Sequence, residues 1–375
     1  MNESYAFEIG LTLCFQVLVV VAATRGLQVW IDDARSSCRL WTVCFLSILG
    51  LMVAAILLPH RRMFAFHESF SPDALVKIIT WQTWLVVALA MVWSTGLAIL
   101  LLRRGIQYSG LLRFLRERCE DITPGQLMAP NQGDAPTVPE LLASDKRLMR
   151  LQLMVSKDIR GPFCWQLHRP VIVLPQYLLR EDQTVLRHVL GHEMEHLRSQ
   201  HPMQHFLQGF CSIVFWFHPV VWWAARNAEL TREFTCDEVV AVADGKIANY
   251  LRTLAKIAEK CTDSHSRSPS GTLAFGNQKS SLIRRSDRLV NLALNPRRKR
   301  PFRSWVAFTS LLLIAFAANQ VWLPTNVIAS TRSDWSPWPR WTARTLYHFD
   351  VRVRDYEPFD ERSQMHELLE RRTTK

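Results

Sequence analysis

Four long apolar stretches constrain the fold of this chain more strongly than any other feature of its sequence. They run over Ile9–Ala23, Trp41–Leu58, Ile78–Leu102 and Trp305–Leu323. A helix needs about 20 apolar residues to cross the ~30 Å hydrocarbon core of a bilayer. The first stretch is short and could be a cleaved signal peptide, but no Lys or Arg precedes it, as a signal peptide requires. We therefore expect a mainly α-helical membrane protein, with three transmembrane helices within residues 1–104 and a fourth at 305–323.

The distribution of basic residues predicts how these spans are oriented. The segment between the third and fourth spans carries Arg103 and Arg104 at its start and the basic run Arg297–Arg300 at its end. Basic residues next to a span are retained in the cytoplasm. The long segment is therefore expected in the cytoplasm, with the N-terminus and a short tail over residues 324–375 outside it.

The basic excess of the chain fits contact with a membrane better than contact with nucleic acid. The net charge is +12, from 45 Lys and Arg against 33 Asp and Glu, and 49% of the residues are hydrophobic. Cytoplasmic loops and anionic lipid explain such an excess, and no DNA- or RNA-binding motif accompanies it. We expect the lipid bilayer as a partner and no direct contact with nucleic acid.

A His-Glu-x-x-His motif lies within the long cytoplasmic segment. His192 and His196 are four residues apart, so on a helix both imidazoles leave the same face and can reach one Zn²⁺. Glu193 would then lie beside a water held by the metal and could take its proton. The alternative is a chance match in a chain with 12 histidines. The motif predicts a zinc ion bound by His192 and His196, with Glu193 as the catalytic base.

A catalytic zinc site needs a third protein ligand, and downstream carboxylates supply the candidates. They are Glu229, Glu233, Asp237 and Glu238. Glu233 and Asp237 are four residues apart and share a helix face, so we assign Glu233 as the third ligand. Asp237 would accept the far ring N–H of a ligand histidine. The alternative for both is a solvated helix face, and the nearby Cys236 is interpreted as a packing residue.

Four motifs in a fixed order resemble those of the BlaR/MecR membrane metallopeptidases, the signal transducers of β-lactam resistance. They are Arg169–Pro175, the helix with His192–His196, Phe215–Trp222 and Glu233–Asp237. The resemblance covers about residues 150 to 245. It implies a gluzincin-type zinc peptidase held in the bacterial inner membrane, with His192, His196 and Glu233 as ligands and Glu193 as the base. After the zinc helix the family usually has a basic stretch ending in Asp, whereas this chain reads Arg198-Ser-Gln-His201, so no role is carried over to that position.

These interpretations predict a small α+β zincin-type metallopeptidase domain inserted between the third and fourth transmembrane helices. Its expected range is 151–261, after a helix and linker at 105–150 and before a flexible, basic juxtamembrane loop at 262–304. Within the domain, Val171–Leu174 is a β-branched run between prolines. It could form an edge strand that pairs with an extended substrate, or an ordinary core strand.

The apolar segment 206–225 raises a geometric problem, because it is long enough to cross a bilayer. A full crossing would separate Glu233 from the two histidines, and no metal site could form. Pro219, His205 and His218 favour a re-entrant or interfacial hairpin instead. His201, His205 and His218 are expected as buried structural histidines, with stabilisation of an oxyanion as the alternative.

We expect a membrane zinc metalloendopeptidase of regulatory type, whose substrate by resemblance is a cytoplasmic transcriptional repressor or the protein itself. The stretch Ser280–Arg285 ends in a basic pair that could be an accessible cut site or part of a juxtamembrane basic helix. No Ser-x-x-Lys motif occurs, so a penicillin-binding sensor domain is not expected. Two alternatives remain: a housekeeping protease for membrane proteins, similar to HtpX, and a non-enzymatic signalling scaffold with a structural zinc site.

Overall fold

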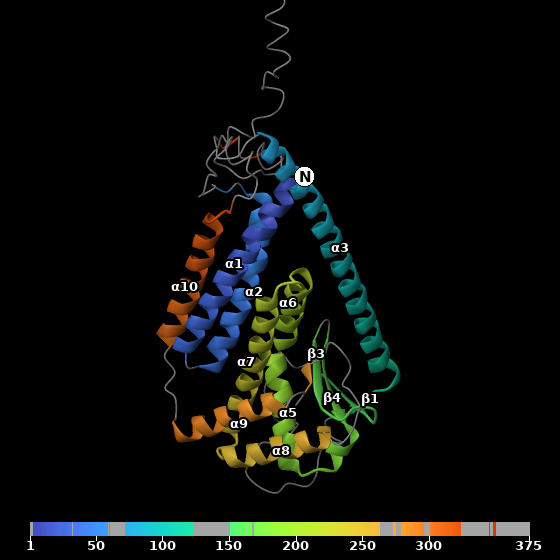
Figure 1. Ribbon diagram of the computed structural model, residues 1–375. Coiled ribbons are helices and arrows are strands. Elements are labelled where there is room, and N and C mark those ends of the chain that lie inside the picture. Colours follow the sequence, from blue (N-terminus) through green and yellow to red (C-terminus); the bar gives the residue numbers. More distant parts are fainter. Residues whose placement is uncertain are drawn as a thin grey trace, which may run out of the picture. The chain divides into compact units, whose positions relative to one another are not determined.

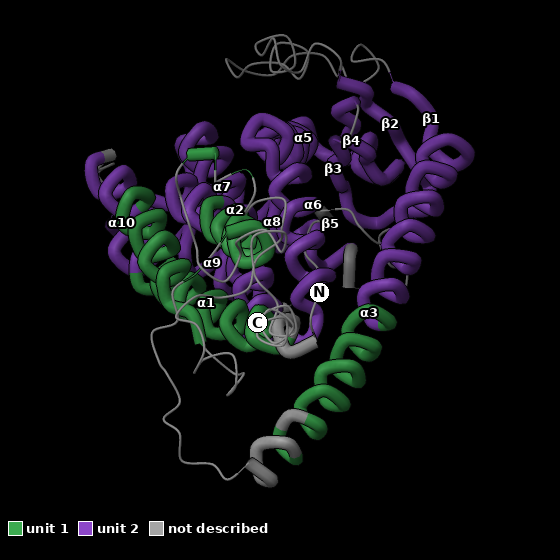
Figure 2. The backbone as a smooth tube through the Cα atoms, turned by 90° about the horizontal axis from the view of Figure 1, so that it is seen from above, with its two compact units in different colours: residues 1–26, 43–95, 308–375 green, residues 27–42, 96–307 purple. Residues whose placement is uncertain are grey.

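The computed structural model describes the chain in segments. They are residues 3–31, 33–58, 60, 72–122, 151–166, 169–262, 273–274, 279–295, 301–323, 345 and 348–349. Most of the expected linker before the catalytic domain and of the C-terminal tail lies outside these residues. The chain divides into two compact units, coloured separately in Figure 2: residues 1–26, 43–95 and 308–375, and residues 27–42 and 96–307.

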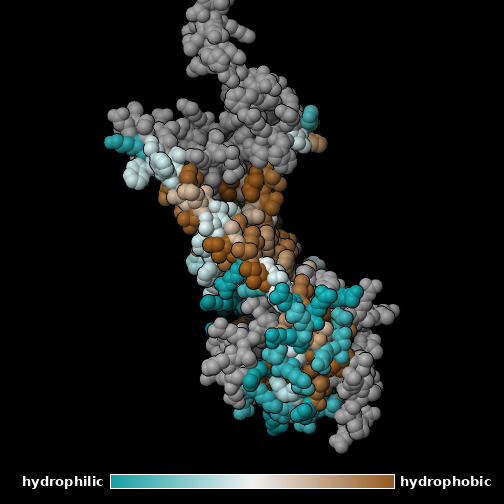
Figure 3. Space-filling view, turned by 90° about the vertical axis from the view of Figure 1, so that its right-hand side faces the viewer, coloured by the Kyte–Doolittle hydropathy of each residue, from teal (hydrophilic) through white to brown (hydrophobic). Residues whose placement is uncertain are grey.

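Within the described residues, four helices are long and apolar enough to cross a membrane. They belong to α1 (Glu3–Trp30), α2 (Ala34–Leu57), α3 (Pro72–Glu117) and α10 (Pro301–Gln320) (Figure 1). Large apolar side chains on α3 are exposed, and they contribute to the brown surface in Figure 3. The expectation of a mainly helical chain with four apolar helices and a small sheet is confirmed.

Polar side chains connect α1 to the end of α10 within the first unit. The side-chain amide of Gln16, which is buried, donates to the carbonyl oxygens of Ala318 and Val321 at 3.0 and 3.2 Å. Next to these contacts, the ring of Trp322 stacks on His60. Because buried polar groups need partners, these bonds favour one pairing of the two helices.

The second unit contains a five-stranded sheet in the order β1-β2-β4-β3-β5. Its strands are β1 (Glu120–Asp121), β2 (Gln152–Ser156), β3 (Phe163–Gln166), β4 (Pro170–Pro175) and β5 (Leu273–Ala274). β2 and β4 are parallel and the other pairs are antiparallel. Val171–Leu174 therefore lies in an inner strand, β4, and the edge-strand interpretation of this run was wrong.

Five further helices among the described residues belong to the second unit. They are α5 (Gln183–Arg198), α6 (His201–Val214), α7 (Pro219–Ala243), α8 (Ile247–Thr262) and α9 (Lys279–Leu294), with a short 3-10 helix η3 (Gln176–Arg180) before α5. Of these, α5 and α6 contact the sheet, and the others pack against these or against one another. The main apolar cluster joins α5, α8, β2 and β4. α9 corrects the expected loop over 262–304, because residues 279–294 are helical and pack against α7 and α8. Leu289 of α9 is buried in a cluster with Val240 and Tyr250, which is why this part of the segment is ordered.

The apolar segment 206–225 is a helical hairpin rather than one helix. α6 ends at Val214, the chain turns through Phe215–His218, and α7 begins at Pro219. The amide of Gln208 on α6 donates to the carbonyl of Ala225 and to the carboxylate of Glu229 on α7, at 3.1 and 3.0 Å. These bonds hold the two helices side by side and return the chain toward α5.

The hairpin lies along the part of α3 that belongs to the same unit. Phe206 contacts Tyr108, Gly209 lies against the Arg104 guanidinium, and Trp216 lies against Gly96. The contacts advance along α6 while they recede along α3, so the two helices are antiparallel. On α3 the contacts run from Gly96 to Tyr108, which at about 1.5 Å per residue is roughly 18 Å of helix.

The contact between Gly96 and Trp216 can be tested with matched substitutions. A Cβ atom at Gly96 would lie 2.6 Å from two carbons of the Trp216 ring, whereas nothing lies within 4 Å of one at Gly105. We expect Gly96→Ala to lower the unfolding temperature in detergent, at a cost of about 1–3 kcal/mol for overpacking. Gly105→Ala is the control and should leave the unfolding temperature unchanged or raised, since alanine favours a helix over glycine. Equal behaviour of the two variants would contradict the packing of the hairpin against α3.

Candidate metal centre

Helix α5 places the His-Glu-x-x-His motif inside the protein. His192, Glu193 and His196 are all buried. The Nε2 atoms of His192 and His196 lie 3.1 Å apart, so both rings turn the same nitrogen toward one point. The helix is buried on most of its surface from Val185 to Leu197, because the sheet, α7 and α8 all pack against it. This packing fixes the direction of both imidazoles.

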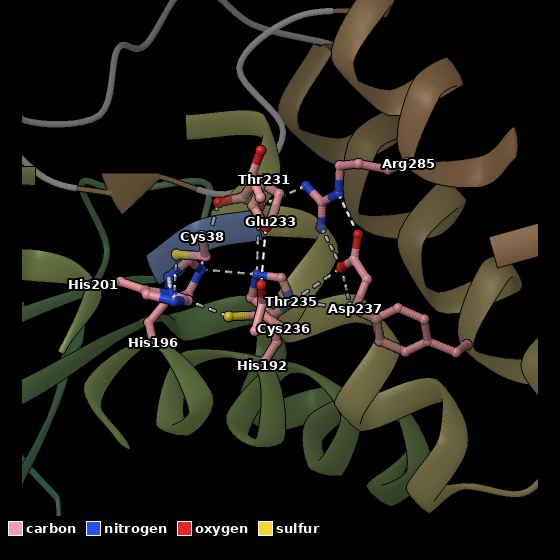
Figure 4. A network of polar contacts seen from close by, with 11 residues as sticks. Cys38, His192, His196, His201, Thr231, Glu233, Thr235, Cys236, Asp237 and Arg285 are labelled. Atoms are coloured by element: carbon pink, nitrogen blue, oxygen red, sulfur yellow. Dashed lines mark hydrogen bonds and ion pairs between the residues drawn. The ribbon is translucent and has the colours of Figure 1, made fainter. Parts of the chain in front are cut away.

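Helix α7 brings a carboxylate to the same point. The oxygens of Glu233 lie 3.5 Å from His192 Nε2 and 3.4 Å from His196 Nε2 (Figure 4). A tetrahedral zinc with nitrogen and oxygen ligands at about 2.0–2.1 Å keeps those atoms about 3.3–3.4 Å apart. The three side chains therefore have the chemistry and the spacing that a zinc ion requires. Of the other candidate carboxylates, Glu229 bonds to Gln208 and Glu238 pairs with Arg288, away from the two rings.

Cys236 offers a second possible donor near the histidines. One donor atom from each of His192, His196 and Cys236 lies within 4.8 Å of the others. For the Glu233 oxygens the individual distances to the two Nε2 atoms are 3.5 and 3.4 Å, which match a shared zinc ion. In addition, Cys236 Sγ lies 3.5 Å from His201 Nδ1, so the thiol already has a polar neighbour. Of the two donors, Glu233 is therefore the better matched to the Nε2 atoms.

Asp237 and Tyr250 lie on the far side of the His192 ring. His192 Nδ1 is 3.2 Å from Asp237 Oδ1 and 3.0 Å from the Tyr250 hydroxyl, which itself donates to Asp237 Oδ1 at 2.7 Å. A proton on Nδ1 leaves the Nε2 lone pair free for a metal. Burial alone would lower the pKa of His192, but the carboxylates of Asp237 and Glu233 outweigh it and raise the pKa to about 9.

Arg285 of α9 pairs with both carboxylates of α7. Its Nε and Nη2 atoms each lie 2.7 Å from an oxygen of Asp237, and its Nη1 atom lies 2.9 Å from Glu233 Oε2. Burial alone would raise the pKa of Glu233, but Arg285 and the histidines lower it to about 2. The sequence left the basic pair with Arg285 open to two interpretations, an accessible cut site or part of a basic helix; Arg285 is helical and its side chain is only 1% exposed, so the accessible interpretation was wrong for this residue. A sequence signal for the burial of Arg285 was its spacing of four residues from Leu289. This spacing places both residues on one helix face, and Leu289 is also buried.

His201 lies on the far side of the His196 ring. The two Nδ1 atoms are 3.0 Å apart, and His201 Nε2 is 3.6 Å from the Sγ atom of Cys38. Burial lowers the pKa of His196 to about 3, so this ring is neutral. A neutral His196 that donates from Nδ1 to His201 presents its Nε2 lone pair toward Glu233. His205, by contrast, has its nearest carboxylate in Glu229, and His218 lies at the start of α7.

The segment around the start of α2 also contacts the zinc-motif helix. Arg35 donates to Glu195 Oε1 at 2.8 Å, and Gln28 donates to the Thr231 hydroxyl on α7 at 3.2 Å. Glu195 is buried, so its charge needs this partner. Sequence reasoning did not find these contacts, because they join residues that are far apart in the chain.

Glu193 points to the side of the centre formed by the sheet. Its carboxylate shares a hydrogen bond with the thiol of Cys164 in β3. Its Oε2 atom is buried and has no hydrogen-bond partner among the described residues. Burial raises the pKa of Glu193 to about 7. A carboxyl group with a pKa near neutrality can both accept and return a proton at physiological pH, as a general base must.

Two comparisons with known proteins both find a similarity to BlaR1-type proteins. The model of the BlaR1 peptidase M56 family matches residues 4–287. Regulatory protein BlaR1 of Bacillus licheniformis is 29% identical over 85 residues, which are 23% of this chain and 14% of that relative. The chain thus matches only a small part of the relative's length.

The hydrogen bond between Tyr250 and Asp237 can be tested by removing one hydroxyl. Tyr250→Phe removes the donor to a buried carboxylate, and we expect it to lower the free energy of unfolding by about 1.5–3 kcal/mol. Tyr177→Phe is the matched control, since the Tyr177 hydroxyl donates to an exposed carbonyl of Arg160 and should cost about 0.5 kcal/mol or less. Chemical unfolding of both variants in detergent measures the difference, and equal losses would contradict the role of Tyr250.

Proposed function

The chain belongs to the BlaR1 peptidase M56 family, and on that premise we propose that it is a membrane zinc endopeptidase of regulatory type. Membership makes it a membrane metallopeptidase of the BlaR1 type and supports protease activity. One observation carries the proposal: the Nε2 atoms of His192 and His196 and the oxygens of Glu233 lie between 3.1 and 3.5 Å apart, next to the buried Glu193. His192, His196 and Glu233 are the proposed zinc ligands.

In peptide hydrolysis the chain's own residues would hold the zinc ion, transfer a proton and keep the ligand side chains in place. When bound, zinc supplies Lewis acidity, which lowers the pKa of water toward ~7 and polarises the peptide carbonyl. Glu193 accepts the proton of the attacking water and returns it to the leaving amine. Asp237 holds the His192 ring and His201 holds the His196 ring, and the sheet and α7 enclose both.

The side of β3 that is now paired with the two-residue strand β5 is the proposed substrate-binding position. Cys164 of β3 contacts Glu193 and is paired with Leu273 of β5. An extended peptide on this side of β3 therefore passes beside the base, as proteases that bind substrate by strand addition require. The present occupant is a segment of the chain itself. This observation supports the protein as its own substrate.

A cytoplasmic transcriptional repressor is the second proposed substrate, and it rests on analogy. The similar B. licheniformis protein is called a regulatory protein, which favours a regulatory role over a housekeeping one. The buried Glu193 and the gathered donor atoms favour an enzyme over a scaffold. We place the protein in the bacterial inner membrane with the catalytic unit on the cytoplasmic side, and the α6–α7 hairpin entering the bilayer beside α3.

One set of variants tests the assignment of the zinc ligands and the assignment of the base separately. Purified wild-type protein should hold one zinc ion by elemental analysis. Glu193→Gln should keep the zinc and lower the rate of peptide hydrolysis by about 10²- to 10⁴-fold, because only the proton acceptor is lost. Glu233→Ala should lose the zinc. Glu238→Ala is the control, since Glu238 lies on the same helix and pairs with Arg288, and full zinc content in Glu233→Ala would contradict the assignment.

Self-cleavage predicts a defined product. Incubated with zinc, the wild-type chain should be cut between α8 and α9, near Leu273 and Ala274, because this segment lies on β3 beside Glu193. Intact-mass measurement locates the cut, and Glu193→Gln should stay whole. A wild-type chain that hydrolyses another peptide but remains whole itself would contradict the role of this segment as substrate.

A further inference from the structure

Helix α9, which carries none of the proposed ligands, also contributes a side chain to the metal centre. Arg285 of α9 is only 1% exposed. A buried guanidinium is costly unless it is paired and hydrogen-bonded. Its described partners are Asp237 and Glu233, one turn apart on α7. We propose that Arg285 is a positioning residue that orients both carboxylates of the zinc centre.

These contacts depend on the planar shape of the guanidinium group as well as on its charge. Nε and Nη2 each donate a hydrogen bond to Asp237 at 2.7 Å, while Nη1 forms an ion pair with Glu233 Oε2 at 2.9 Å that lacks hydrogen-bond geometry. Three nitrogens in one plane thus hold two carboxylates in a fixed relation. An ammonium group has a single nitrogen and cannot bind two carboxylates in this way.

Each contact has a consequence for one proposed ligand. With both oxygens held by Arg285, the Asp237 carboxylate cannot rotate, and its Oδ1 atom stays 3.2 Å from His192 Nδ1. With Oε2 held by Arg285, Glu233 keeps Oε1 at 3.4 Å from His196 Nε2. Arg285 therefore influences the position of Glu233 directly. It influences His192 through Asp237, and His196 through Glu233.

Arg288 offers a matched control on the same helix. It pairs with Glu238 of α7 at 2.6 Å, so it also joins α9 to α7 through an ion pair. The Arg288 and Glu238 side chains are 22% and 18% exposed, so this pair lies nearer the surface than Arg285 does. Replacing Arg288 by lysine tests the loss of an arginine ion pair between the same two helices, at a residue that holds neither Asp237 nor Glu233 in this structure's contacts.

The experiment compares wild type, Arg285→Lys and Arg288→Lys as full-length proteins in detergent. Zinc affinity is measured by competition with a chromophoric chelator, and Co²⁺ is bound in place of zinc for its visible absorption spectrum. Partners of metal ligands typically contribute 10- to 100-fold in metal affinity. We expect Arg285→Lys to bind zinc about 10- to 100-fold more weakly, with an altered Co²⁺ spectrum. Arg288→Lys should match wild type in both measurements.

A second variant tests the same proposal in case Arg285→Lys does not fold. Asp237→Asn/Arg285→Gln replaces the buried ion pair by two neutral amides and leaves no uncompensated charge between them. It should also bind zinc more weakly than wild type and change the Co²⁺ spectrum. Wild-type affinity and spectrum in either folded variant would overturn the positioning role of Arg285.

This inference rests on the proposed function, because it takes Glu233 as a ligand. The wild-type titration keeps the two claims apart. A wild type that binds no zinc would overturn both the proposed function and the role of Arg285. Tight and equal zinc binding by wild type and Arg285→Lys would overturn only the proposed role of Arg285.

Discussion

The centre depends on one geometric constraint, namely that a carboxylate on α7 reaches two imidazoles on α5 across an apolar segment. That segment would cross a bilayer if it were a single helix. The turn at Phe215–His218 divides it, and the bonds of Gln208 to Ala225 and Glu229 hold α6 against α7. Glu233 thereby comes within 3.5 Å of His192. Without the hairpin the His-Glu-x-x-His motif would lack its third donor.

Charge balance explains why a divalent cation suits this interior. The carboxylates of Glu193, Glu233 and Asp237 and the guanidinium of Arg285 are gathered in one place, and with both imidazoles neutral, as metal ligands must be, these four groups sum to −2 when all are ionised. Buried charge is costly unless it is paired. One doubly charged ion would neutralise the set. Arg285 offsets part of the charge by itself, and it also fixes the directions of two of the carboxylates.

Local periodicity allowed several parts of this centre to be predicted from the sequence. A spacing of four residues places His192 beside His196, and Glu233 beside Asp237, whatever the rest of the fold does. The apolar lengths of the four long helices are also local properties, and so is the break that Pro219 suggests within 206–225.

The missed parts depend on contacts between distant residues. Val171–Leu174 was open to an edge or core interpretation because strand order is set by pairing across the sheet. The pair with Arg285 was open to an accessible or a helical interpretation, and the burial of Arg285 was missed because its partner Asp237 is 48 residues away. The same holds for Tyr250, which reaches His192 over a separation of 58 residues. Composition around 262–304 suggested a loop, yet α9 forms there because its Arg285 and Leu289 face α7.

The identity of the third donor is the central claim, and X-ray absorption at the zinc edge tests it most directly. The account predicts only nitrogen and oxygen neighbours at about 2.0–2.1 Å, from two imidazoles and the Glu233 carboxylate. A sulfur neighbour at about 2.3 Å would contradict it, because Cys236 would then hold the metal in place of Glu233.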